Sequence, residues 1–168
     1  EQQSEFFASR DNWCRPVMIR TGPDGALWIA DMYRLVIEHP EWIPKDWQQR
    51  IDLRAGSDRG RLYRVVPTAR AARAVPQLDR LDTAGLVAQL ESPNGWIRDT
   101  VQQMLLWKSD PGATVHLRRM SSSPTPTARL HALCTLDGLG ELRPSDVGAA
   151  LTDRHPGVRR HAARLAHP

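Results

Sequence analysis

The chain has 168 residues, 40% of them hydrophobic and 25% charged, which fits one ordinary domain or two small ones with a packed core. Its formal net charge is +4, but 21 of the 23 basic residues are arginines scattered among acids rather than clustered. This distribution disfavours nucleic acid as a partner, because phosphate binding needs a concentrated basic surface.

The first predicted element is a β-hairpin. Val17 and Ile19 alternate with their neighbours, and so do Leu27 and Ile29, which is the period of two that strands show. Between these runs lies the segment 23–25, Pro-Asp-Gly. Proline presets the first corner of a turn, aspartate can bond its own backbone, and glycine accepts a left-handed conformation. The pattern predicts two antiparallel strands.

A third strand is predicted at residues 62–66, after a long irregular segment with a short helical candidate at 44–52. A loop of this length is often packed by its own side chains. We expect that packing to come from Tyr33, Trp42, Ile43 and Trp47. Pro16 lacks the backbone donor that a central ladder needs, so we expect it to open the first strand.

The second half of the chain is predicted to be helical. Residues 67–76 lack an apolar period and are bracketed by prolines, and beyond them the apolar period changes to about 3.6, as at Leu86, Val87 and Leu90. We therefore predict an incomplete β domain at residues 1–66, a linker at 67–82 and helical repeats at 83–168.

Three similar segments open helices in this half, and they end at Arg98, Arg129 and Arg159, spaced 31 and 30 residues apart. Each lies between two apolar helical runs, so the period resembles HEAT-like repeats that stack into a solenoid. We expect the arginines to form a ladder, pairing with acids such as Asp99 and Asp153 or with carbonyls at helix ends. We expect Trp96 and Trp107 to pack in the core or between repeats.

The first 66 residues also resemble a known family, the planctomycete-type (PVC) membrane-bound dehydrogenase and haem-binding proteins. The resemblance is to the last blade of their β-propeller, except that Cys14 stands where an aromatic residue is expected. The matching pieces are Trp13-Cys14-Arg15-Pro16-Val17, Gly22-Pro23-Asp24-Gly25-Ala26-Leu27, Asp31-Met32-Tyr33-Arg34, Ile37-Glu38-His39-Pro40-Glu41-Trp42-Ile43-Pro44, Asp52-Leu53-Arg54-Ala55-Gly56 and Asp58-Arg59-Gly60-Arg61. The implied fold class is mixed β then α: a terminal propeller blade, which is an antiparallel sheet, followed by a HEAT-like helical solenoid.

The resemblance implies a larger periplasmic or secreted protein with more propeller before this segment and a c-type haem domain after it. The implied activity is dehydrogenation of a carbohydrate-like substrate, with electrons passing to haem. The alternative is a non-catalytic scaffold that binds carbohydrate or a protein partner. No signal peptide and no apolar run able to span a bilayer is visible in the segment, which leaves export and membrane association untested.

Five residues of the predicted blade are candidates for a polar, catalytic site facing the propeller channel: Arg15, Asp31, Tyr33, Glu38 and His39. Carboxylate, histidine and arginine side chains could line a site for a polar substrate or a metal where loops converge. The alternative is that these groups form turns and ion pairs that tie the long loop to the sheet.

No cofactor site can be read from the residues themselves. Cys14 and Cys134 lie far apart, and no Cys-x-x-Cys-His haem attachment motif is present. Pyrroloquinoline quinone (PQQ) and calcium stay open without a supporting motif; for calcium, Asp24, Asp31 or Asp52 could serve with backbone carbonyls, although the EF-hand spacing is absent. One histidine beside one glutamate is too few ligands for a zinc site.

Overall fold

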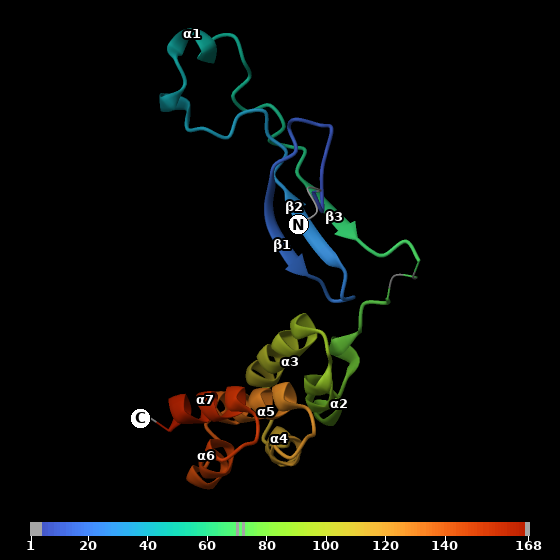
Figure 1. Cartoon of the computed structure of the whole chain (residues 1–168), viewed down its shortest axis with the longest axis vertical. Helices are drawn as coiled ribbons and strands as arrows, with labels where there is room; N and C mark the ends of the chain where they lie inside the picture. The colour runs from blue at the N-terminus through green and yellow to red at the C-terminus, as the bar shows by residue number, and fades with distance from the viewer. Residues whose placement is uncertain (1–4, 70, 72, 167–168) are drawn as a thin grey trace. The chain divides into compact units, whose positions relative to one another are not determined.

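The computed structural model describes residues 5–69, 71 and 73–166, which divide into two compact units (Figure 1). We call them the sheet unit, Glu1–Gly22 with Ala26–Arg73, and the helical unit, Pro23–Gly25 with Ala74–Pro168. An antiparallel sheet followed by helices packed in pairs confirms the predicted order of β then α. Residues 1–4, 70, 72 and 167–168, which the predicted domains and linker include, lie outside the described residues.

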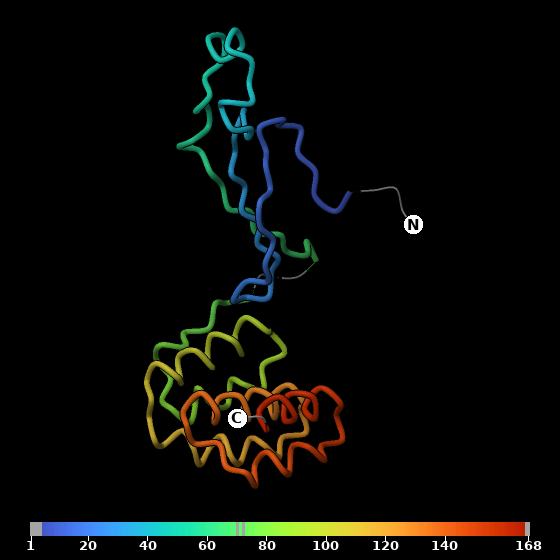
Figure 2. The backbone as a smooth tube through the Cα atoms, turned by 90° about the vertical axis from the view of Figure 1, so that its left-hand side faces the viewer, coloured from blue at the N-terminus to red at the C-terminus, as the bar shows by residue number. Residues whose placement is uncertain are grey.

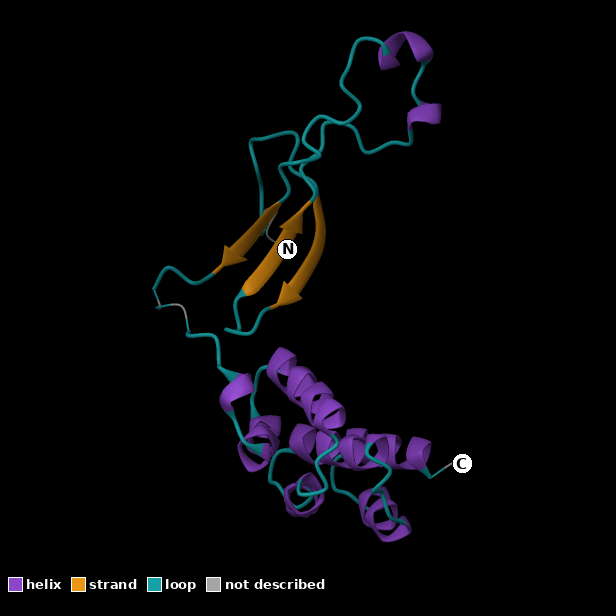
Figure 3. Ribbon diagram, turned by 180° about the vertical axis from the view of Figure 1, so that it is seen from behind, coloured by secondary structure: helices purple, strands orange, loops and turns teal. Residues whose placement is uncertain are grey.

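The sheet has three antiparallel strands in the order β1-β2-β3 (Figure 3). They span Pro16–Thr21, Leu27–Asp31 and Arg61–Val65. The hairpin between the first two is as predicted: Pro16 opens β1, and Gly25 takes the left-handed conformation at the turn, with φ 77°. The register then pairs Asp31, the last residue of β2, with Arg61, the first residue of β3.

Much of the apolar surface of this sheet is exposed. Ile29 on the central strand is fully buried, but Val17 on β1 is 61% exposed and Leu62 on β3 is 71% exposed. All six residues of β1 are exposed, and among the described strands β1 pairs with β2 alone. A three-stranded sheet with two free edges buries little apolar area by itself.

The segment between β2 and β3 extends away from the strands as a long loop (Figure 2). It contains the 3-10 helix η1, Pro40–Trp42, and the short helix α1, Lys45–Gln48. The amide of Gln48 holds the loop closed by donating to the carbonyl oxygens of Pro40 and Ile43, both at 2.7 Å. The expectation that tryptophans pack this loop is wrong, because Trp42 is 83% exposed and Trp47 is 55% exposed.

The helical unit contains six α-helices and two 3-10 helices among its described residues. Consecutive helices pack as pairs, and α5 lies between α3 and α7. Its core consists mainly of leucine and valine side chains, with Leu86, Leu90, Leu117 and Leu136 fully buried. The elements are η2 Leu78–Arg80, α2 Thr83–Ala88, η3 Gln89–Glu91, α3 Gly95–Lys108, α4 Ala113–Met120, α5 Pro126–Gly138, α6 Pro144–Leu151 and α7 Pro156–Leu165.

The repeated arginines occupy one structural position, as predicted. In each repeat the guanidinium Nη1 donates to the carbonyl oxygen of the residue six positions earlier. These bonds are Arg98 to Ser92 at 2.7 Å, Arg129 to Ser123 at 2.8 Å and Arg159 to Asp153 at 2.8 Å. Each bond satisfies a carbonyl in the turn that precedes the helix, which is why arginine recurs at this spacing.

Arg129 also forms a buried ion pair with Asp153 of the next repeat. Its Nε and Nη2 donate to the two carboxylate oxygens, both at 2.7 Å, and the two side chains are only 7% and 12% exposed. Such a two-pronged pair fixes the geometry of both groups. It therefore ties the turn before α5 to the turn before α7.

Of the two acids named as partners for these arginines, Asp153 pairs with Arg129, whereas the Asp99 carboxylate approaches Nε2 of His131 at 3.8 Å. One expectation for this unit is wrong. Trp107 is not packed, since 76% of it is exposed. No helix among the described residues is both long and apolar enough to cross a lipid bilayer.

Candidate functional site

The best-connected polar residue of the sheet unit is Asp31, which is only 3% exposed at the end of β2. One carboxylate oxygen, Oδ1, accepts the backbone N–H of Arg15 at 2.7 Å and that of Tyr33 at 2.8 Å. The other, Oδ2, accepts the hydroxyl of Tyr63 at 3.3 Å. One side chain therefore ties the residue before β1, the residue after β2 and strand β3 together.

These bonds decide the charge of Asp31. Burial by itself raises the pKa of a carboxyl group, but here the donors at Arg15 and Tyr33 outweigh it and lower the pKa below its ordinary value. Asp31 is thus ionised at neutral pH. The thiol of Cys14 also interacts with this carboxylate, and burial together with that negative charge raises the pKa of Cys14.

Tyr33 has an unusual backbone conformation and a stacked ring. Its φ of 51° is left-handed, which is uncommon for a residue other than glycine. Arg61 lies over the ring, with its guanidinium carbon 3.7 Å from the ring centroid, and the Trp13 ring is tilted against it at 5.7 Å. A glycine is required at position 56, next to Tyr33. The φ of Gly56 is +88°, and a Cβ there would lie 2.2 Å from the Tyr33 carbonyl oxygen.

Arg61 connects the remaining members of the network. It donates to the Tyr63 hydroxyl at 3.1 Å and pairs with Asp11 at 3.4 Å. The Trp13 backbone N–H, followed by the Tyr33 hydroxyl, lowers the pKa of Asp11, and the bond to Asp11 raises the pKa of Tyr33. We define the Asp31 cluster as Asp11, Trp13, Asp31, Tyr33, Arg61 and Tyr63, with the backbone N–H of Arg15.

The structure brings three of the five predicted site residues to this cluster. Asp31 and Tyr33 are members through their side chains, but Arg15 joins only through its backbone N–H. The Arg15 guanidinium turns back to the carbonyl oxygens of Asn12 and Cys14. The Arg15 guanidinium therefore forms hydrogen bonds within its own loop.

Glu38 and His39 lie in the exposed loop, and no contact among the described residues connects them to the Asp31 cluster. His39 caps η1 by accepting the backbone N–H of Glu41 at 3.4 Å, and Glu38 accepts the N–H of Ile37 at 3.3 Å. Glu38 also lines an open pocket of about 430 Å³ with Arg34 and Arg54. The same pocket is also lined by Met32, Val36, Ile37 and Leu53, so it combines charged residues with an apolar surface.

Sequence reasoning missed Arg61 and Tyr63 as members of the cluster. The available signal was the strand pairing: once β2 and β3 are antiparallel with Asp31 opposite Arg61, both side chains reach the end of β2. Asp11 and Trp13 gave no comparable signal, because they lie in an irregular segment before β1.

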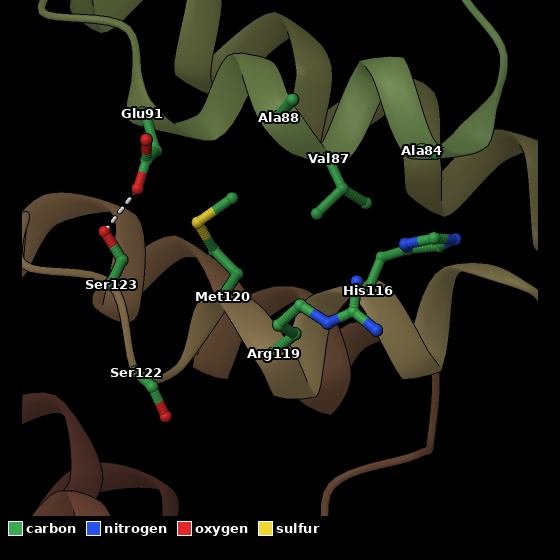
Figure 4. A pocket seen from close by; sticks show the side chains of 9 residues that line it. All are labelled: Ala84, Val87, Ala88, Glu91, His116, Arg119, Met120, Ser122 and Ser123. Carbon is green, nitrogen blue, oxygen red and sulfur yellow. Dashed lines mark hydrogen bonds between the residues drawn. The ribbon is translucent and has the colours of Figure 1, made fainter.

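The helical unit has a separate pocket of about 320 Å³ between α2 and α4 (Figure 4). Val87 and Met120 supply its apolar surface, and Ser123 closes one end by donating to the Glu91 carboxylate at 2.5 Å. None of the residues predicted from sequence as catalytic lies in it. No motif in the sequence pointed to this pocket.

The cysteines and the acidic side chains bear on the haem and metal sites considered from the sequence. Both cysteines are free thiols, and one lies in each unit, so the chain offers no haem attachment pair. Among residues 5–69, 71 and 73–166, no three His, Cys, Asp or Glu side chains come together in a way that could hold a metal ion. The Asp31 oxygens, considered for calcium, are already occupied by protein donors.

Comparison with known families adds one finding. Residues 1–69 match a domain of unknown function, DUF7133. The DUF7133 match covers all three strands, the loop with η1 and α1 and the whole Asp31 cluster, and it ends before η2, the first helix of the helical unit. No curated protein and no solved structure matches the chain.

Proposed function

We propose that this chain is a non-catalytic scaffold segment that joins part of a β-propeller to a helical solenoid. The observation that carries the proposal is the Asp31 cluster. Its central carboxylate is buried, and both of its oxygens already accept protein donors, two backbone N–H groups on Oδ1 and a tyrosine hydroxyl on Oδ2. A group bonded in this way stabilises loops around a strand end.

The exposed surface of the sheet supports the same proposal. Val17, Ile19 and Leu62 are at least half exposed, and β1 has a free edge. Unpaired strands with apolar side chains are normally covered by further strands or by another layer. In this proposal, which follows the resemblance to the planctomycete-type dehydrogenase and haem-binding proteins, the cover is the remainder of a propeller in a periplasmic or secreted protein whose partner is carbohydrate or protein.

Hydrogen exchange tests this proposal. In the 168-residue chain, we expect the β1 amides that point away from β2 to exchange quickly, since they lack a partner strand. In the complete gene product, the same amides should be strongly protected, whereas amides of the exposed loop around α1 should exchange alike in both and serve as the control. Equal, fast exchange of β1 in both proteins would reject the propeller proposal.

A second candidate function is supported by the pocket at Glu38. If the complete protein is a dehydrogenase, a carbohydrate-like substrate could bind between Glu38 and the guanidinium groups of Arg34 and Arg54, and Glu38 could accept a hydroxyl proton. The electrons would pass to a haem held outside this chain. If this candidate is correct, Glu38→Gln should abolish turnover of the carbohydrate-like substrate by the complete protein. The same substitution should leave the free energy of unfolding unchanged.

A further inference from the structure

The pocket at Glu38 lies where the two ends of the long loop run side by side. Nη2 of Arg34, near the start of the loop, donates to the carbonyl oxygen of Leu53, near its end, at 3.0 Å. The backbone N–H of the next residue, Arg54, donates to the Asp52 carboxylate at 2.8 Å. These bonds hold both segments in place, so two arginines from different parts of the loop line the same pocket.

The three charged side chains of this pocket do not neutralise one another. Among the ion pairs of the described residues, none joins Glu38 to Arg34 or to Arg54. Arg34 is partly buried, and its Nε has no acceptor within the described part of the chain. A partly buried cation without a carboxylate beside it favours an anionic ligand, whereas Glu38 favours a cationic one. A ligand that carries both charges satisfies both ends of the pocket.

The rest of the pocket lining is apolar. It consists of Met32, Val36, Ile37, Pro40 and Leu53. A neutral sugar supplies no charge for the arginines or the glutamate, and an aliphatic carboxylate supplies only one of the two. An aliphatic zwitterion supplies both charges and also an apolar group for this surface. The volume of about 430 Å³ is within the range of small-molecule sites.

We propose that this pocket binds a free α-amino acid with an aliphatic side chain, such as leucine. The carboxylate of the ligand bonds to the guanidinium groups of Arg34 and Arg54, and its ammonium group pairs with Glu38. Hydrogen bonds between charged groups of this kind are the strong ones. The proposal rests on the pocket alone and not on the scaffold role. It gives the pocket a different ligand from the carbohydrate-like substrate of the second candidate function.

A nuclear magnetic resonance titration of the 168-residue chain tests the proposal. We expect L-leucine to cause saturable shifts of the amides at residues 34–38 and 53–55. Three relatives of leucine each lack one of the matched groups: isocaproate has no ammonium group, isoamylamine has no carboxylate and glycine has no aliphatic side chain. Each should bind about tenfold more weakly than leucine, because each loses one charged or apolar contact.

Substitutions in the pocket test the same contacts from the side of the protein. Arg54→Gln and Glu38→Gln should each weaken leucine binding about tenfold, since each removes one charge that faces the ligand. Both side chains are exposed, so the fold should be retained. The matched control is Arg50→Gln, because Arg50 is an exposed arginine of the same loop that does not line the pocket. This variant should bind leucine as the wild type does.

Three results would overturn the proposal. Leucine could cause no saturable shift, or isocaproate and isoamylamine could bind as tightly as leucine. D-glucose could instead bind more tightly than leucine and depend in the same way on Glu38 and Arg54, which would support the carbohydrate candidate. None of these results affects the exchange of the β1 amides in the complete gene product, so the scaffold proposal can succeed or fail separately.

Discussion

Replacing Arg129 by methionine is expected to destabilise the helical unit by about 3 kcal/mol, because breaking a buried ion pair leaves an uncompensated charge. The charge left behind is that of Asp153, whose carboxylate is 12% exposed. Urea unfolding followed by far-ultraviolet circular dichroism measures the loss. Arg160→Met, an exposed control thirty-one residues further on, should change the stability by less than about 0.5 kcal/mol.

A second substitution separates the ion pair from packing. Arg129→Met combined with Asp153→Asn removes the buried charge, and the asparagine can still accept the backbone N–H of His155 as Asp153 does at 2.7 Å. We therefore expect the double variant to be more stable than Arg129→Met alone. A double variant that is as unstable as the sum of the two single changes would show that the charge pair is not the cause.

The same pair also predicts a dependence on pH. The Arg129 guanidinium holds the pKa of Asp153 at about 2, below the ordinary value of 3.8. Because the folded state lowers this pKa, the stabilisation is complete above about pH 4 and is lost as the pH falls toward 2. Arg129→Met should flatten this part of the stability curve.

Replacing Asp31 by alanine is expected to destabilise the sheet unit by about 3 kcal/mol. The change removes the acceptor of two backbone N–H groups, those of Arg15 and Tyr33, and each unsatisfied buried donor costs about 1–3 kcal/mol. The unfolding of β2 amides in urea, followed by nuclear magnetic resonance, reports on this unit alone. Asp31→Asn should be milder, since its amide oxygen can take the place of Oδ1 and still accept both backbone bonds.

Asp58→Ala is the matched control for this change. Asp58 is an exposed aspartate of the same unit, and its ion pair with Arg59 is long at 3.9 Å. Pairs of this kind contribute at most about 1 kcal/mol. If Asp31→Ala cost no more than Asp58→Ala, the Asp31 cluster would not be what holds the strand ends together.

Local patterns were sufficient to predict the hairpin and the arginine positions. The alternation around Val17 and Leu27 and the Pro-Asp-Gly turn depend on neighbouring residues, and both appear as predicted. The spacing of the repeated arginines likewise follows from repeated helix pairs. These features need no knowledge of distant contacts.

Features that depend on distant contacts were not predicted. Arg61 reaches Tyr33 only because β3 returns beside β2 after the long loop, and the register of that return cannot be read from either strand alone. Packing of Trp42 and Trp47 was inferred from the length of the loop, but both side chains are mostly exposed. Glu38 and His39 were grouped with Asp31 because they are close to it in sequence. No contact among the described residues connects them to the Asp31 cluster.

The most direct test of the scaffold account is a spectroscopic measurement on the complete gene product, expressed in a host that attaches haem. The reduced-minus-oxidised absorption spectrum is recorded with a panel of sugars for the wild type and for the variant Glu38→Gln with His39→Ala. The account predicts that the two proteins behave alike, whether or not a sugar reduces haem. Sugar-dependent haem reduction that is lost in the variant, while its urea midpoint stays that of the wild type, would contradict the account and place catalysis in the loop at Glu38.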